Sequence, residues 1–410
     1  MMRHWIRRCV KWGGAAGLAL VLPVWGNPAA TAAKAAEAAA EKAAPATVVQ
    51  TPPAHVGTWH VRELEGVEYV PLEDLRSFYK LMPLQPKGRK VVGQRMVGNG
   101  EVELRFGPAP RELFIQGYLC MLTHPVQEDS SGDLLISTSD VQNVIEPVLR
   151  PTYIPNRQAV RTVVLDPAHG GHDTGTVTPY AREADVALVV ATKLGAELRK
   201  RGYEVILTQE HNQYLSPQAR VDKANAAPAA IFVSLHLNSG RSDMKGVQTY
   251  TIAPASKGEK PLPGHEFCQS SMALAMALQS TLIDKAEAVD GGCRRAHYSP
   301  LNSLRCPSVM VELGYATHPE EGTRLSGEEY QLKLVSALAA GVDAYARTAN
   351  PATVLQVQKA PVVETPAEPV KVEPAPAMPK AKPQPRKAKP RKKAPRRRAP
   401  ARRGKNRRRR

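Results

Sequence analysis

Short apolar runs alternate with longer amphipathic runs throughout residues 161–349, and this alternation restricts the segment to few folds. Runs that are short and rich in β-branched residues, which predict strands, occupy residues 161–166, 203–208, 231–236, 246–252 and 306–314. Runs with helical periodicity occupy residues 185–202, residues 268–286 and a stretch from Ser326 onward, where Ser326 and Glu329 have the spacing of a capping box. This order predicts an α/β domain with a mostly parallel sheet flanked by helices.

The rest of the chain divides into four further parts. Residues 1–29 begin with basic residues, continue as a short apolar run and end in small residues, which is typical of a cleaved export signal. Residues 30–56 are rich in alanine and proline and predict a linker, whereas residues 57–150 alternate apolar runs with turns and predict a small α+β domain. Residues 350–410 are rich in proline, lysine and arginine, cannot bury a core and are expected to be disordered. The signal predicts a periplasmic or cell-envelope location.

The positive charge of the chain is concentrated near its end. Residues 380–410 contain 18 of the 56 Lys and Arg residues and no acidic residue, while the remainder balances 38 basic residues against 38 acidic ones. By composition this tract would suit nucleic acid. An exported protein meets other polyanions, so we expect binding to anionic envelope polymers or lipids and no nucleic acid partner. A solubilising extension is the alternative interpretation.

Cysteine usage allows disulfides but does not determine them. Removal of the signal, which contains Cys9, would leave Cys120, Cys268, Cys293 and Cys306. Four cysteines allow three complete pairings, and an exported protein lies in a compartment that permits them. Cys293 with Cys306 is the first pair to test, and buried free thiols are an equally weighted alternative.

Three strand ends in the α/β segment carry groups that can bind a metal or move a proton. His169 follows the first strand, His236 ends the third and Glu312 ends the last, while Glu183 lies just before the first helix. In an open α/β sheet, ligands bind beyond the carboxyl ends of the strands. Two imidazoles and one carboxylate are the ligands of a catalytic zinc, and a second carboxylate is the general base that metal-assisted hydrolysis needs.

Each of these residues also has an ordinary interpretation. A histidine at the end of a strand is usually a polar loop residue, and an acid at a helix start is favoured by the helix dipole. Glu312 is more unusual, because it follows three apolar residues in a run that predicts burial, where an unpaired carboxylate is costly. The spacing matches no local metal-binding signature. These residues by themselves therefore predict only a possible zinc hydrolase.

Longer motifs around these residues resemble those of the zinc-dependent N-acetylmuramoyl-L-alanine amidases. The matching blocks, in the family's order, are DPAHGG at 166–171, Glu183 before a helix, Arg220 with Ala224 and Asn225, SLHLN at 234–238, and PSVMVELG at 307–314. The resemblance extends over residues 161–347. Ala168 stands where the family usually has glycine, which is harmless only if the backbone φ there is negative.

The resemblance implies a reaction and a role for each matching residue. Enzymes of this family hydrolyse the amide between muramic acid and the stem peptide of peptidoglycan. Carried over to this sequence, His169, Glu183 and His236 bind Zn²⁺, and Glu312 is the catalytic acid and base. The expected role is cell-wall turnover or cell separation, with peptidoglycan as the partner.

Three further residues near the motifs have less specific expectations. Arg294 aligns with a basic position near the family's cleft and is expected, together with Asn238, to bind substrate. His172 forms a His-x-x-His pair with His169 and could be a rival ligand, although an exposed loop position is the favoured interpretation.

Residues 57–150 are more weakly similar to the copper-amine-oxidase-like N-terminal domain of bacterial envelope proteins. The similarity lies in YVPLEDL and DLLISTSDV, and it implies no copper site. A wall-binding or spacing role would follow only by analogy. The alternative function for the whole chain is a catalytically inactive peptidoglycan-binding envelope protein with a polyanion-binding tail. The presence of both glutamates beside both histidines argues against that alternative.

Overall fold

The computed structural model describes residues 59–349, except 84, 88–89, 98–99, 108, 156, 229 and 257. The predicted export signal, the linker at 30–56 and the tail from residue 350 lie outside the described residues and stay predictions. Within the described part, no helix combines the length and the apolar character needed to cross a membrane.

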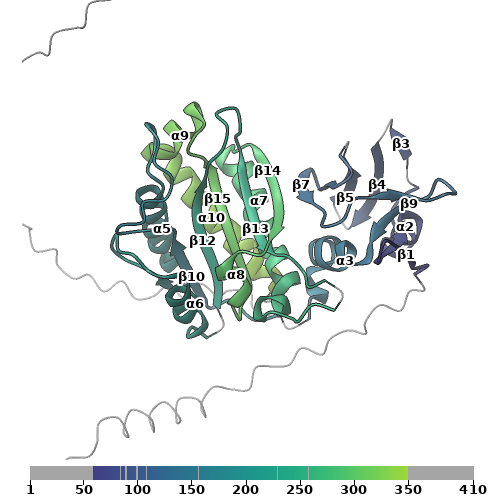
Figure 1. Ribbon diagram of the computed structural model, residues 1–410, viewed down its shortest axis with the longest axis horizontal. Coiled ribbons are helices and arrows are strands. Elements are labelled where there is room, and N and C mark those ends of the chain that lie inside the picture. Colours follow the sequence, from purple (N-terminus) through teal and green to yellow (C-terminus); the bar gives the residue numbers. More distant parts are fainter. Residues whose placement is uncertain are drawn as a thin grey trace, which may run out of the picture. The chain divides into compact units, whose positions relative to one another are not determined.

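The α/β segment has strands and helices in close alternation (Figure 1). Its strands are β10 (Thr162–Pro167), β11 (Glu204–Leu207), β12 (Ala230–Asn238), β13 (Val247–Ile252), β14 (Asp290–Ala296) and β15 (Ser308–Tyr315). Its helices are α5 (Glu183–Lys200), α6 (Pro217–Asn225), η3 (Pro263–Phe267), α7 (Cys268–Ala286), α8 (Ser299–Ser303), α9 (Pro319–Ser326) and α10 (Glu328–Ala349). The strand order in this part of the sheet is β11-β10-β12-β15-β13-β14.

The direction of the strands confirms the mostly parallel sheet expected from the sequence. β11, β10, β12 and β15 are parallel to one another. β13 runs antiparallel to β15, and β14 is parallel to β13, so these two strands run in the opposite direction. The carboxyl ends of β10, β12 and β15 therefore meet at one edge of the sheet.

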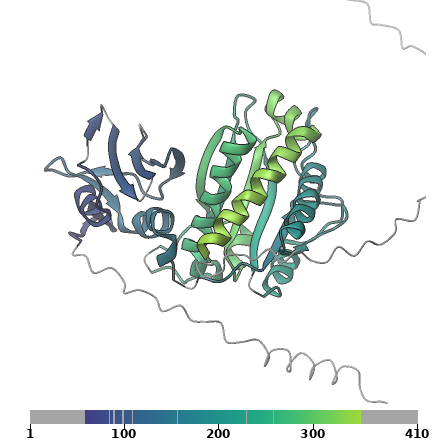
Figure 2. The same cartoon turned by 180° about the vertical axis from the view of Figure 1, so that it is seen from behind.

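The two faces of the sheet are covered differently. The long helices α5, α7 and α10 cross one face (Figure 2) and pack against alternate strand residues such as Val163 and Leu165. On the other face, the short helices α6 and α8 pack near Val164, Phe232 and Met310. Because successive side chains of a strand point to opposite faces, Glu312 shares the face of Met310, and His236 shares that of Phe232.

Two helix boundaries test the sequence prediction. The predicted stripe of α5 is buried, and the helix ends at Lys200, two residues before Gly202, which has a φ of +90°. The capping box predicted at Ser326 is wrong, because α10 begins at Glu328 and Ser326 is the last residue of α9. Its hydroxyl donates instead to the carbonyl of Tyr180 at 2.5 Å.

The N-terminal part has the α+β content expected from the sequence. Its strands are β1 (Arg62–Leu64), β2 (Val67–Pro71), β3 (Gln85–Lys87), β4 (Lys90–Val97), β5 (Gly100–Phe106), β6 (Glu112–Ile115), β7 (Tyr118–Met121), β8 (Gln127–Glu128) and β9 (Leu134–Ser137). Its helical segments are α2 (Leu72–Tyr79), α3 (Thr138–Asp140), η1 (Val141–Ile145), α4 (Glu146–Leu149) and η2 (Pro151–Tyr153). β1, β2, β9 and β8 form one sheet, and β7-β6-β5-β4-β3 continue the main sheet beyond β14.

The N-terminal part contacts β14 through one strand bridge from β7 and one buried ion pair from α3. Cys120 of β7 lies opposite Cys293 of β14. The guanidinium of Arg295 is ion-paired with Asp140, and both side chains are buried. Burial raises the pKa of Asp140, but Arg295 and hydrogen bonds from Ser137 and the backbone more than offset this, so the pKa lies below its ordinary value.

The disulfide between Cys293 and Cys306, the first pair to test, does not form in the structure, where both cysteines are free and buried. Cys293 packs in the cluster beneath the long helices, whereas Cys306 packs on the opposite face of the sheet. Two side chains separated by the sheet cannot be joined by a disulfide without moving the backbone. The residue opposite Cys293 is Cys120.

Candidate active site

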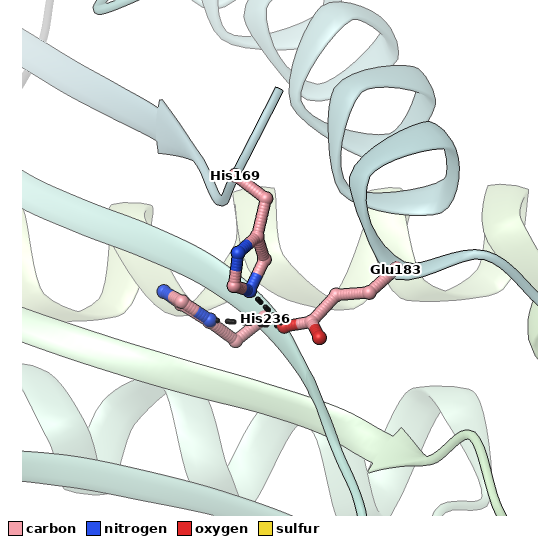
Figure 3. A group of neighbouring side chains, drawn as sticks. All are labelled: His169, Glu183 and His236. Atoms are coloured by element: carbon pink, nitrogen blue, oxygen red, sulfur yellow. Dashed lines mark hydrogen bonds and ion pairs between the residues drawn. The ribbon is translucent and has the colours of Figure 1, made fainter. Parts of the chain in front are cut away.

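Three polar side chains from distant parts of the chain meet where β10 and β12 end (Figure 3). His169 follows β10, His236 lies near the end of β12, and Glu183 is the first residue of α5. One ligand atom from each lies within 4.8 Å of the other two. Oε1 of Glu183 is 3.0 Å from Nε2 of His169 and 3.0 Å from Nδ1 of His236. The three residues thus direct two nitrogens and one oxygen toward a common point.

The imidazole of His169 is fixed in orientation by its second nitrogen. Nδ1 lies 2.9 Å from Oδ2 of Asp173, which accepts a hydrogen bond from that nitrogen and leaves Nε2 facing Glu183. A carboxylate in this position sets the tautomer of a metal-ligating histidine. Asp173 is therefore a partner that the sequence motifs did not single out.

The backbone of His169 is held in a conformation unusual for a side-chain-bearing residue. Its φ is +59°, in the left-handed region. Its carbonyl accepts two hydrogen bonds of 2.6 Å, one from Nε2 of Gln209 and one from Nη2 of Arg220. The same two side chains also donate to the carbonyl of Pro167, at 2.9 and 2.7 Å. This clamp holds the loop that presents the imidazole.

A buried carboxylate anchors the clamp. Asp166 is 1% exposed and accepts hydrogen bonds from Nη1 of Arg220 at 2.7 Å, from the hydroxyl of Thr208 at 2.6 Å and from the hydroxyl of Ser234 at 2.8 Å. A buried charge is tolerated when it is paired and hydrogen-bonded in this way. Asp166 and Arg220, which both belong to the sequence motifs, therefore hold the backbone of the loop that carries His169.

The glycines of the loop are needed because protein atoms lie against them. A Cβ at Gly170 would lie 2.3 Å from the carbonyl oxygen of Gln213, and one at Gly171 would lie 2.7 Å from the nitrogen of Tyr214. At Gly175 it would lie 2.5 Å from Cδ2 of His169. The φ of Ala168, in contrast, is not positive, so the backbone accommodates a methyl group at this position.

Glu312 lies beside this cluster on the neighbouring strand. It is opposite His236 in the register of β12 and β15. Its Oε2 is buried, and no described residue donates a hydrogen bond to it. Burial raises the pKa of Glu312 to about 7, and the charge of Glu183 adds to this, while His236 and His169 lower it. An unpartnered carboxyl with a neutral-range pKa suits a group that exchanges protons with a water or a substrate.

The charges of the cluster favour cation binding. Burial raises the pKa of Glu183, but hydrogen bonds from His169 and His236 more than offset this, so the pKa lies far below its ordinary value. The hydrogen bond to Glu183 raises the pKa of His169 to about 9. Glu183 is thus an anion, and His169 carries a proton at neutral pH that a metal would displace from Nε2. With that proton released, the donor set fits Zn²⁺, which takes nitrogen and carboxylate ligands in a tetrahedral arrangement.

The remaining residues expected at the site occupy different places. Asn238 donates to Oε1 of Gln248 at 2.9 Å. Arg294 of β14 lies opposite Tyr250 of β13 in the strand register. His172 does not join the ligand cluster: its ring lies over that of Tyr214, with centroids 4.3 Å apart. The structure therefore brings His169, rather than the His169 and His172 pair, to the candidate metal site.

Comparisons with known proteins find a matching family model and several similar proteins. A family model described as N-acetylmuramoyl-L-alanine amidase matches residues 163–344. The uncharacterized protein YqiI of Bacillus subtilis (strain 168) is 32% identical over 185 residues, which cover 45% of this chain and 84% of that protein. N-acetylmuramoyl-L-alanine amidase LytC of the same organism is 28% identical over 189 residues, covering 45% of this chain and 36% of LytC. The crystal structure of N-acetylmuramoyl-L-alanine amidase from Clostridium difficile 630 is 30% identical, with a TM-score of 0.41 over 46% of this chain and 97% of that one.

Proposed function

Because the chain belongs to the N-acetylmuramoyl-L-alanine amidase family and is a peptidoglycan-cleaving enzyme of that class, we propose that His169, Glu183 and His236 hold a Zn²⁺ ion. The observation that carries this proposal is the convergence of their three ligand atoms within 4.8 Å. Three protein ligands are typical of a catalytic zinc site, which keeps a further position for water or substrate. Bound there, Zn²⁺ supplies Lewis acidity to the substrate carbonyl and lowers the pKa of water.

Glu312 is the acid and base of the proposed reaction. The bond that breaks joins the lactyl carbonyl of muramic acid to the nitrogen of L-alanine. Glu312 accepts a proton from the attacking water and later donates a proton to the leaving nitrogen, so that the products are a lactyl carboxylate and a free amine. Its position beside His236 and its pKa of about 7 suit both transfers.

Mass spectrometry of the products from purified peptidoglycan tests the reaction and its metal together. The protein is incubated with Zn²⁺, with a chelator, and as the Glu312→Gln variant. We expect free stem peptides and peptide-free glycan strands with Zn²⁺, and neither product in the other two reactions. Glu320→Gln is the matched control, since Glu320 is exposed in the first turn of α9.

Two outcomes would overturn the proposal in different ways. Unchanged products in the presence of chelator would exclude a required metal. Intact peptidoglycan together with tight binding of the protein would favour the inactive, peptidoglycan-binding alternative.

We also propose that Arg294 binds a carboxylate of the stem peptide and that Asn238 lines the same region. The strand register supports this, because Tyr250 lies opposite both Arg294 and Met310 and thereby puts Arg294 on the face that carries Glu312. Arg294→Gln should raise KM for muropeptides with a free stem-peptide carboxylate more than for their amidated forms. An equal effect on both would remove Arg294 from substrate recognition.

The biological setting is a further part of the proposal. We propose an exported enzyme of the periplasm or cell envelope that serves cell-wall turnover or cell separation, because its substrate class lies there. The basic residues at 380–410 would hold it near anionic envelope polymers or lipids. A chain ending at residue 349 should then associate less with isolated envelopes, and the difference should shrink as salt rises. Equal association of both chains would leave the tail without this role.

A further inference from the structure

The four cysteines that the structure describes are buried, and none of them takes part in the proposed reaction. Cys120 and Cys293 lie in the core cluster beneath the long helices, whereas Cys268 and Cys306 lie in the cluster that contains Phe232. A disulfide joins Cα atoms that are about 4.4–6.8 Å apart. It therefore joins two cysteines of one cluster more readily than cysteines that the sheet separates.

Of the described cysteines, only Cys120 and Cys293 lie opposite each other on paired strands. They form the bridge at which β7 runs parallel to β14. Neighbouring strands lie about 4.7–4.9 Å apart, which is within the range that a disulfide spans. A hydrogen bond with the thiol of Cys293, together with burial, raises the pKa of Cys120 well above its ordinary value, as expected for two sulfur atoms in contact.

Contacts on both sides of this pair fix β7 against β14. Before the pair, the backbone nitrogen of Leu119 donates to Oδ2 of Asp290 at 2.8 Å. After it, Nη2 of Arg295 donates to the carbonyl of Met121 at 3.4 Å, and the same guanidinium is ion-paired with the buried Asp140. These contacts prevent one strand from sliding past the other, so the fold itself holds the two thiols opposite each other.

We propose that Cys120 and Cys293 form a disulfide when the chain folds under oxidising conditions, and that this bond fastens the N-terminal part to the catalytic segment. One thiolate attacks a disulfide-bearing oxidant to give a mixed disulfide, and the second thiolate then displaces the remaining sulfur of the oxidant. The two thiols lose two protons and two electrons, and the oxidant is reduced to two thiols. Export, as proposed above, would supply such conditions, whereas the bond itself depends on neither the metal nor the amidase reaction.

Burial determines when the bond forms and how well it persists. Both thiols are buried, and the raised pKa of Cys120 disfavours the thiolate that disulfide exchange requires. The bond should therefore form during folding, before β7 and β14 enclose the two sulfur atoms, and should then resist reductants in the folded protein. It also closes a long loop of the chain, which stabilises the fold by restricting the unfolded state.

Mapping the thiols of the wild-type chain tests the bond directly. The full chain is denatured and reduced, and it is then refolded with a mixture of glutathione disulfide and glutathione. A cooperative thermal transition identifies the refolded protein, which is alkylated with N-ethylmaleimide in denaturant without reductant and digested. We expect mass spectrometry to find Cys120 linked to Cys293, with Cys268 and Cys306 alkylated. Refolded protein in which Cys120 and Cys293 are not linked to each other overturns the proposal.

Two variants test whether the cross-link stabilises the protein. The oxidised wild type should unfold about 5–10 °C above the reduced wild type, because the bond closes a long loop. Cys120→Ser should lose this difference, whereas Cys306→Ser, which changes a buried cysteine of the other cluster, should keep it. A difference that persists in Cys120→Ser overturns the proposed fastening by this bond. The thiol map uses the wild-type chain, so it decides the pairing even if a variant fails to fold.

Discussion

Replacing Gly175 with alanine should lower the affinity for Zn²⁺, because the added methyl group displaces the side chains of His169 and Glu183 in addition to straining the backbone. Gly175 has a φ of +59°, a left-handed conformation that costs an L-residue about 1–2 kcal/mol. The added Cβ would also lie 2.5 Å from Cδ2 of His169 and 2.7 Å from Oε2 of Glu183. Both ligand side chains must therefore move when the methyl group is added.

The size of the effect follows from these distances. Carbon atoms in favourable contact lie about 3.5–4.0 Å apart, so the imidazole and the methyl group must separate by about a further 1 Å. Metal–ligand distances are held within about 0.2 Å. We expect the affinity for Zn²⁺ to fall by about 10–100-fold, the range seen when the support of a ligand is altered. This corresponds to about 1.4–2.7 kcal/mol of binding free energy.

Competition with a chromophoric chelator measures the affinity, and thermal unfolding of the metal-free protein measures the backbone cost. Gly202→Ala is the matched control, because Gly202 has a φ of +90° and no atom lies within 4 Å of the position that its added methyl group would take. Both variants should lose stability, and only Gly175→Ala should lose affinity. Equal affinities for Zn²⁺ in the two variants would refute the assignment of His169 and Glu183 as ligands.

Three further predictions concern the clamp around His169, the carboxyl of Glu312 and the junction at β14. Gln209→Ala removes a donor to the carbonyl of His169 and should weaken Zn²⁺ binding by about tenfold in calorimetric titrations. As the proposed base, Glu312 must start as a carboxylate, and its pKa is about 7, so kcat/KM should fall as the pH drops below about 7; a bound cation should move this limb to lower pH. Asp140→Asn leaves the guanidinium of Arg295 without its anionic partner and should lower the free energy of unfolding by about 3–5 kcal/mol in denaturant titrations.

Each of these predictions has a result that contradicts it. Gln218→Ala alters an exposed glutamine of α6, and an equal loss of affinity in that variant would remove any special role of Gln209. A pH profile that stays flat from neutral pH down to pH values near 4 would exclude Glu312 as the base. Asp243 is exposed and pairs only with Arg241 among the described residues, so Asp243→Asn should be almost neutral; a loss equal to that of Asp140→Asn would contradict the role of burial.

The parts of the fold that repeat a local pattern were predictable from the sequence. The strands ending near His169, His236 and Glu312 are short apolar runs, and the periodicity of α5 is unambiguous. Parallel strands bring their carboxyl ends to one edge, so the meeting of the two histidines follows from topology once the strands are assigned. The position of Glu183 before a helix made it a candidate, and only the resemblance assigned it, rather than Glu312, as the metal ligand.

Other features depend on contacts between distant segments, which local patterns do not encode. Gln209 follows β11 and belongs to no motif, yet it holds the backbone of His169. The glycines of the loop beside His169 lie against protein atoms of other segments, such as the carbonyl oxygen of Gln213. Cys293 and Cys306 lie close in sequence but on opposite faces of the sheet, because Cys293 belongs to β14 and α8 intervenes before Cys306.

The bridge between β7 and β14 gives residues 59–150 a consequence for solubility. A catalytic segment produced without them would present β14 as a bare edge strand, whose unpaired backbone groups can pair with the same strand of another copy. Arg295 would lose Asp140 in the same step. Such a truncated enzyme should self-associate with rising concentration even with His169, Glu183 and His236 in place. We therefore expect the N-terminal part to limit edge-to-edge association of the catalytic segment through this bridge.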